Sequence, residues 1–141
     1  YLALVEGRPP IEGKIDATLG RHPKDRQRQA VVNNGKPAVT YFKQQENFHQ
    51  HCLLLCQLET GRTHQIRVHL KHLGFPLVGD ATYGSNKNTL AKRSYPQTAA
   101  FNRQALHAWQ LGLVHPTSKE NLSWQQPLPA DMANLVASLR S

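Results

Sequence analysis

The run ETGRTHQIRVHL, residues 59–70, is dense in hydrogen-bond donors. A glycine there follows an expected strand and precedes apolar residues at helical spacing, so the run is predicted to be a turn that leads into a helix. The N-terminus of a helix carries free N–H groups and a positive dipole end, and both favour a phosphate. Arg62, His64 and Arg67 add side-chain donors around that point. We therefore predict an anion-binding site here; the alternative, a charged helix face in water, stays open.

Spacing divides the expected helix into two faces. Ile66 and Leu70 fall four residues apart, and the apolar pattern continues for another turn, which is typical of a buried helix face. On a helical wheel Arg67 and Lys71 lie with His64 on the opposite side. We expect one buried face and one strongly basic face.

Other kinds of catalytic site have weaker support. The nine acids include no close pair in an apolar setting, which acid–base catalysis by carboxylates would need, and no Gly-x-Ser-x-Gly motif frames a serine nucleophile. Asp80 is interpreted as an acid that caps a turn rather than as a catalyst. His69 and His72 are three residues apart and do not converge with His64, so no metal site is predicted. The histidines are expected to be solvated, to face RNA or to be hydrogen-bonded.

The composition limits the class of protein. The 141 residues suit one domain, carry a net charge of +8, and include no apolar run near the roughly 20 residues that a membrane span requires. So large a positive charge favours a polyanionic partner, and neither a secretion signal nor a membrane is expected. Cys52 and Cys56 lie about 13 Å apart if the segment is a strand, too far for a disulfide. Two buried thiols fit a reducing cytoplasm.

Hydrophobic patterns predict an α+β fold with a mainly antiparallel mixed sheet and a few short helices. The strands expected to share one sheet are residues 1–5, 38–43, 51–58 and 103–114. Short strands are also expected at residues 13–19 and 122–125, helices at 64–73 and 131–139, and loops at 21–28 and 85–100.

Several of these segments resemble the RluA-type pseudouridine synthases. The most specific is ETGRTHQIRVH at residues 59–69, and PLVGDATYG follows at residues 76–84. The likeness spans nearly all 141 residues. Further similar segments are YLALVEG at 1–7, GKPAVT at 35–40, RQALHA at 103–108, HP at 115–116 and PLPADM at 127–132.

The resemblance implies a cytoplasmic, monomeric enzyme that isomerises uridine to pseudouridine in large-subunit ribosomal RNA or its precursor, without metal or organic cofactor. In the family an Asp acts on a flipped-out uridine, a Tyr lies against the base, and a basic residue pairs with the Asp. Residue by residue, Tyr1 corresponds to that Tyr and Arg67 to the basic partner. Contacts with RNA are expected at Arg62, His64, Gln65, Lys71 and Arg103.

The nucleophilic Asp is the point at which this chain departs from the family. It lies in a run that resembles His-Arg-Leu-Asp, and none of the nine acids here stands in such a run. Residues 1–141 are therefore expected to be the C-terminal part of a catalytic domain, inactive alone. Arg67 would then depend on water, a bound anion or a nearby acid. A non-catalytic RNA-binding module remains the alternative function.

Overall fold

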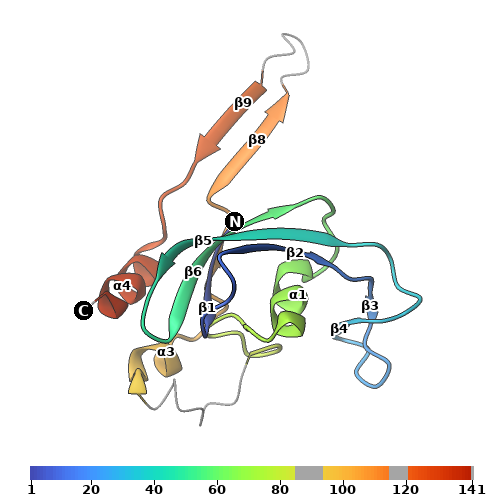
Figure 1. The fold of residues 1–141 in the computed structure, drawn as a ribbon, viewed down its shortest axis with the longest axis horizontal. Coiled ribbons are helices and arrows are strands. Elements are labelled where there is room, and N and C mark those ends of the chain that lie inside the picture. The colour runs from blue at the N-terminus through green and yellow to red at the C-terminus, as the bar shows by residue number, and fades with distance from the viewer. Residues whose placement is uncertain (85–93, 115–120, 141) are drawn as a thin grey trace.

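A five-stranded antiparallel sheet forms the centre of the structure (Figure 1). The structure, a computed structural model, describes residues 1–84, 94–114 and 121–140. The predicted α+β fold with an antiparallel sheet is confirmed, since every pair of neighbouring strands in this sheet runs antiparallel. In spatial order the strands are β2 (Glu12–Asp16), β5 (Val39–Asn47), β6 (His51–Leu58), β1 (Leu2–Glu6) and β7 (Leu106–His107).

The strand sequences match their places in the sheet. β1 reads LALVE, all of its residues are buried, and it lies between β6 and β7. A strand covered on both faces is expected to be such a continuous apolar run. In β5, Thr40 and Phe42 are buried whereas Tyr41 and Lys43 are exposed. One face of the sheet is therefore covered at β5, and the other is open.

Two helices pack against opposite faces of the sheet. Successive residues of a strand point to opposite sides, so β1 contributes to two separate cores. Leu4 packs in one core with Met132 of α4 (Ala130–Leu139). Val5 packs in the other with Leu70 of α1 (Gln65–Leu73). The two faces are named below the α4 face and the α1 face.

The two predicted helices are confirmed to within one residue at their starts. Gly74 ends α1 with a left-handed φ of 101°, and its N–H bonds back to the helix, as a terminating glycine does. The predicted loop at residues 85–100 is wrong in its last part, because α3 (Pro96–Ala100) forms there. Residues 85–93 lie outside the described part of the chain.

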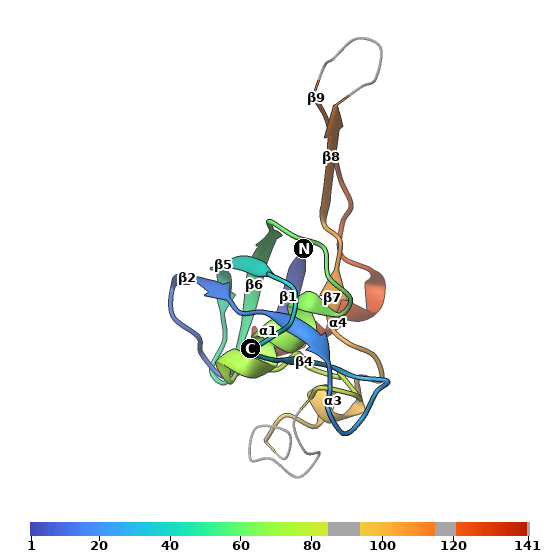
Figure 2. The same cartoon turned by 90° about the vertical axis from the view of Figure 1, so that its right-hand side faces the viewer.

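The single strand predicted at residues 103–114 is wrong. Only β7 joins the main sheet; β8 (Gln110–Val114) pairs instead with β9 (Asn121–Gln125) in a two-stranded hairpin. Both views show this hairpin projecting away from the sheet (Figures 1 and 2). The change of direction is fixed where the Gln126 N–H donates to the Trp109 carbonyl at 2.7 Å. Alternating apolar residues continue through that point, so the pattern alone could not reveal it.

A second hairpin lies beside α1. The predicted strand at residues 13–19 is divided between β2 and β3 (Leu19–Arg21), and β3 pairs with β4 (Gln29–Val31). The basic run at residues 21–28 forms the connection between them, as predicted. Val31 packs with Val68 of α1, so the hairpin is joined to the helix.

Two negative expectations can be compared with the structure. No helix in the described ranges is both long and apolar enough to cross a membrane. Cys52 and Cys56 are free thiols, as predicted, and both are buried on the α1 face. Burial raises the pKa of Cys52 to about 11 and that of Cys56 to about 12, so neither is a ready nucleophile at neutral pH.

Candidate active site

The loop before α1 is fastened to β5 through the amide of Gln65. Its oxygen accepts hydrogen bonds from the Thr60 hydroxyl at 2.7 Å and from the Arg62 backbone N–H at 3.0 Å. Its nitrogen donates to the Val39 carbonyl at 2.9 Å and to the Thr40 hydroxyl at 3.0 Å. Gln65 is only 2% exposed, so it shapes the loop from inside, and this position does not support its predicted contact with RNA.

His64 stands at the start of α1 in an unusual backbone conformation. Its φ of 56° makes it the one non-glycine residue with positive φ in the described part of the chain. Its Nδ1 lies 2.8 Å from the Tyr83 hydroxyl, and the two rings meet edge to face. Burial, helped by the charge of Arg67 and opposed by that of Asp80, lowers the pKa of His64. The imidazole is therefore held as a neutral group at the helix N-terminus.

Arg67 and Asp80 form a two-pronged ion pair. The Arg67 Nε donates to Asp80 Oδ2 at 2.8 Å, and its Nη2 donates to Oδ1 at 2.9 Å. The two side chains are 14% and 1% exposed. The prediction that Arg67 lies on an exposed basic helix face is therefore wrong. Arg67 has a nearby acid as its partner, which was one of the alternatives left open for it. The interpretation of Asp80 as a turn-capping residue holds as well, because Oδ1 accepts the N–H groups of Thr82 and Tyr83 at 3.0 Å each.

The electrostatics of this pair favour both charges. Burial by itself would raise the pKa of Asp80, but the hydrogen bonds from Arg67 and from the Tyr83 and Thr82 backbone, with the positive charge, hold it below its ordinary value. The hydrogen bond to Asp80 raises the pKa of Arg67 against the effect of burial. Asp80 is consequently a charged anchor at neutral pH and not a proton donor.

Tyr83 joins this pair to the β3–β4 hairpin. Its ring lies beneath the Arg67 guanidinium, with 4.9 Å between the guanidinium carbon and the ring centroid. Its hydroxyl accepts the backbone N–H of Gln29 at 2.9 Å and lies at hydrogen-bond distance from His64. Sequence reasoning missed Tyr83, although its segment PLVGDATYG was part of the resemblance.

Tyr1 lies on the same side of the sheet as α1. Its backbone continues the β1–β6 ladder, since the amino group donates to the Cys56 carbonyl at 3.0 Å and the Cys56 N–H donates to the Tyr1 carbonyl at 2.8 Å. Alternation places the Tyr1 side chain on the face of Ala3 and Val5, the α1 face. Tyr1 is 40% exposed, which leaves its ring accessible.

The other predicted RNA contacts fall in two separate places. Arg62 and Lys71 are exposed at the two ends of the α1 region, and the Arg62 Nε donates to the Pro37 carbonyl at 3.0 Å. Arg103 lies elsewhere, paired through two hydrogen bonds of 2.8 Å with Asp131 at the start of α4. The structure thus gathers Arg62, His64, Arg67 and Lys71 along α1 and its leading loop, and separates Arg103 from them.

A basic hollow of about 580 Å³ lies next to Arg62. Arg21 from β3, Lys36 and Arg62 contribute its positive charges, and backbone from the loop at Gly61 and Thr63 completes that side. No acid lines it. Guanidinium, ammonium and backbone N–H groups are the donors that bind nucleic-acid phosphates. Of the residues in the predicted anion site, Arg62 lines this hollow, whereas His64 and Arg67 do not.

Metal-binding side chains do not gather anywhere in the described ranges of the chain. His69, considered for a metal, is instead buried between the Thr40 hydroxyl at 2.8 Å and the Ala17 carbonyl at 2.9 Å. Burial lowers the pKa of His69, outweighing the hydrogen bond to Ala17. Its role in this structure is to join α1 to the sheet.

Comparison with known proteins agrees with this arrangement. Residues 1–72, which hold β1, the basic loop and nearly all of α1, match the family model described as RNA pseudouridylate synthase. The chain belongs to this family. The solved structures of human RNA pseudouridylate synthase domain containing 4 and domain containing 1 superpose with TM-scores of 0.76 and 0.73, at 25% and 28% identity. Each comparison covers 99% of this pseudouridylate synthase chain, and 60% and 64% of the human chains.

Among bacterial members of the pseudouridylate synthase family, a ribosomal large subunit pseudouridine synthase D from Nitrosomonas europaea is 52% identical over 145 residues. The Escherichia coli protein of the same name is 43% identical over 144 residues. The likeness to the D-type synthases, which the basic segment GRHP at residues 20–23 also indicates, is confirmed. This chain spans 40% and 44% of the length of these two relatives.

Proposed function

We propose that this chain is part of an enzyme that isomerises uridine to pseudouridine in large-subunit ribosomal RNA. The observation that carries the proposal is Arg67, held by Asp80 on the α1 face of the sheet, the face that also bears Tyr1. The names of the D-type relatives, which act on the ribosomal large subunit, support this substrate. Such a substrate would place the enzyme in the cytoplasm, and a monomer suffices for the roles proposed here.

The geometry suits the proposed part of Arg67 in that reaction. Isomerisation breaks the bond between C1′ and N1 of uridine, forms a bond between C1′ and C5, and moves a proton from C5 to N1. Asp80 takes the Nε and Nη2 edge of the guanidinium, which leaves the N–H groups of Nη1 for a second acceptor. We assign that edge to the family's nucleophilic Asp. Asp80 itself is unsuited to the nucleophile's role because its oxygens accept hydrogen bonds from Arg67, Thr82 and Tyr83.

Tyr1 is the proposed contact for the reacting base. Enzymes that act on a base remove it from its stack at a cost of a few kcal/mol, about what one aromatic contact can recover. The accessible Tyr1 ring on the α1 face supports this role. The exposed Arg62, with the basic hollow beside it, and the exposed Lys71 at the other end of α1 would hold phosphates of the same RNA.

The decisive experiment compares pseudouridine formation by three proteins on large-subunit ribosomal RNA. The 141-residue chain alone should be inactive, because none of its nine acids lies in a His-Arg-Leu-Asp run. A protein in which a family segment carrying that run precedes Tyr1 should be active. The same protein with Asp replaced by Asn in that run should lose activity. Turnover by the 141-residue chain alone would show that one of its own acids is the nucleophile.

The second candidate is a non-catalytic RNA-binding module. The observation in its favour is that Arg67 already has a carboxylate partner, so its charge is satisfied without a nucleophile. The three-protein comparison separates the two functions. A module would bind RNA with a strong salt dependence, from release of counterions, but would form no pseudouridine in any of the three proteins.

A further inference from the structure

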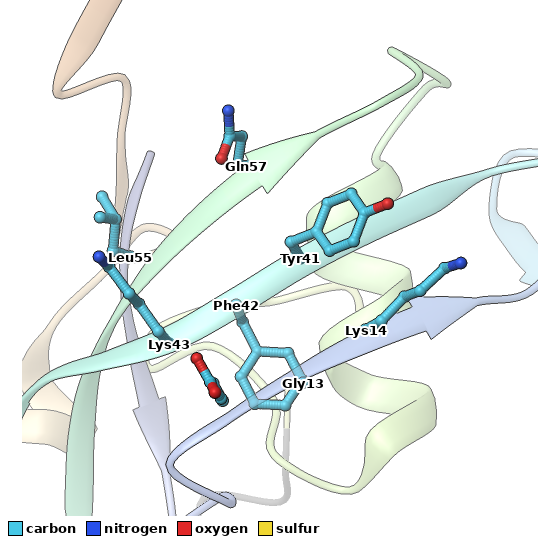
Figure 3. A pocket seen from close by; sticks show the side chains of 8 residues that line it. Gly13, Lys14, Tyr41, Phe42, Lys43, Leu55 and Gln57 are labelled. Atoms are coloured by element: carbon cyan, nitrogen blue, oxygen red, sulfur yellow. The ribbon is translucent and has the colours of Figure 1, made fainter.

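The open part of the α4 face carries a cluster of side chains for which the active site has no use. It spans β2, β5 and β6 and surrounds a hollow of about 430 Å³. Figure 3 shows Tyr41 and Lys14 extending side by side from β5 and β2, with Lys43, Leu55 and Gln57 farther along the same surface. We call the five residues Lys14, Tyr41, Lys43, Leu55 and Gln57 the Tyr41 surface.

Strand register brings these side chains together. Tyr41 lies opposite Lys14 on one side and opposite Gln57 on the other. Lys43 lies opposite Leu55 on one side and opposite Glu12 on the other. Directly opposed residues share a face, so all five point away from α1. The floor of the hollow lies where Gly13 pairs with Phe42, whose ring is buried on the α1 face.

The exposure of Tyr41 is unusual in this molecule. At 37% it is one of three large hydrophobic residues in the described ranges that are classed as exposed, with Tyr1 and Ile11. Its neighbour Lys14 places Nζ 6.0 Å from the ring centroid, the outer limit of a cation–π contact. No salt bridge to Lys14 or Lys43 forms within the described part of the chain, so both ammonium groups are available to a partner.

We propose that the Tyr41 surface binds an unpaired nucleotide of RNA, with the base stacked on Tyr41 and its phosphates contacted by Lys14 and Lys43. An aromatic ring on a sheet, flanked by cationic side chains, suits single-stranded nucleic acid because every base has a face that stacks. Gln57 can donate to and accept from the edge of such a base.

Charge favours this occupant over a second copy of the chain. Each copy carries +8, so joining two Tyr41 surfaces would oppose positive charges across an interface. The lining contains two lysines and one acid, Glu12, so it is itself positive. The inference rests on the proposed function in one respect, that RNA is the substrate; it adds a contact on the side of the sheet away from Arg67.

The test measures binding of a single-stranded oligouridine and of an RNA duplex of equal length to the whole protein that carries this chain. Tyr41→Ala should weaken binding of the single strand by about 5- to 150-fold, the effect of losing one stacked base, and should change duplex binding much less. Tyr41→Phe keeps the ring and should stay within about twofold of wild type. Ile11→Ala, at an exposed apolar residue outside the hollow, is the matched control and should change nothing.

Two further readouts locate the contact. Lys14→Ala should reduce the slope of log affinity against log salt by about 0.7, the value for one phosphate of a single strand. An oligonucleotide with 4-thiouridine should crosslink to a peptide that contains Tyr41, and the crosslink should disappear in Tyr41→Ala. Unchanged single-strand binding by Tyr41→Ala, or a crosslink absent from wild type because another segment covers this face, would overturn the inference.

Failure of the inference can be told apart from failure of the proposed function. If wild type forms pseudouridine and Tyr41→Ala binds oligouridine normally, only the Tyr41 site is wrong. If wild type forms no pseudouridine but loses oligouridine binding on Tyr41→Ala, the site stands and the enzymatic function is wrong.

Discussion

The α1 face and the Tyr41 surface lie on opposite sides of one sheet and use their polar groups in opposite ways. On the α1 face, Arg67 donates to Asp80 at 2.8 and 2.9 Å, and its guanidinium lies over the Tyr83 ring. Little of this ion pair is exposed. On the Tyr41 surface the lysines form no salt bridge in the described ranges, although Glu12 lies opposite Lys43, and the ring is open.

This difference separates two ways of building a site. A buried polar group must form its hydrogen bonds within the protein, and these bonds hold it in a fixed position. An exposed group is hydrated by solvent, and it can exchange that water for a ligand. We therefore expect substitutions on the α1 face to affect stability and turnover, and those on the Tyr41 surface to affect affinity.

The largest effect is expected at Arg67, in the whole active protein. Arg67→Lys keeps a positive charge but cannot engage Asp80 and a second acceptor through a planar fork, so turnover should fall by about 10³-fold or more. RNA affinity should stay within about twofold, because exposed basic residues supply it. Arg140→Lys, in a similar but exposed two-pronged pair with Glu46, is the control and should retain turnover. Near-normal turnover by Arg67→Lys would remove Arg67 from the proposed site.

Asp80 should have the next largest effect, on stability. Asp80→Asn leaves the Arg67 charge buried without its partner, and breaking such a pair costs about 3–5 kcal/mol of unfolding free energy. Asp131→Asn is a matched control, since Asp131 accepts the same two-pronged contact from Arg103 on the surface and its loss should matter far less. Urea denaturation measures both variants. Equal effects would mean that burial of the Arg67 pair is unimportant.

Tyr83→Phe should have a moderate effect. The ring stays beneath Arg67, but the Gln29 N–H and the His64 ring lose the hydroxyl, at a cost of about 1–3 kcal/mol. Unfolding free energy from urea curves measures this loss. Tyr41→Phe removes a hydroxyl with no hydrogen bond in the described structure and should leave stability unchanged. If the two variants behave alike, the Tyr83 hydroxyl does not join the hairpin to α1.

The smallest expected effect is a pH dependence from His69. Its pKa is lowered in the folded state, so between that value and about 6.5 the unfolded chain binds more protons. Stability should therefore be fully present above about pH 6.5 and decline as the pH falls. Urea denaturation at pH 7.5 and 5.5 measures the decline, and His69→Gln should reduce it. An equal decline in His69→Gln would assign the effect to other groups.

Patterns in the sequence were most reliable where burial is local to one element. The mainly apolar run at residues 51–58 and the helical apolar spacing from Ile66 to Leu73 predicted β6 and α1. The same reasoning failed at Ala108 and Trp109, where the chain leaves one sheet for another while the alternation continues. Hydrophobic pattern records burial but not which strand provides it.

The site was harder to predict because its contacts join distant positions. The helical wheel placed Arg67 opposite the apolar stripe, and opposite was taken to mean exposed. The turn at Asp80 folds back over that side and covers it, which no periodicity in the helix could show. The burial of Gln65 was missed for the same reason, because its partners on β5 lie far away in the sequence.

The two faces are proposed to contribute in different ways to the reaction of one RNA, and saturation curves for three proteins test this most directly. The measurement is the rate of pseudouridine formation against RNA concentration for wild type, Arg67→Lys and Tyr41→Ala, each in the whole active protein. We expect Arg67→Lys to lower kcat with little change in KM, and Tyr41→Ala to raise KM and keep kcat. A change in KM alone for Arg67→Lys, or a lower kcat with unchanged KM for Tyr41→Ala, would contradict this division between the two faces.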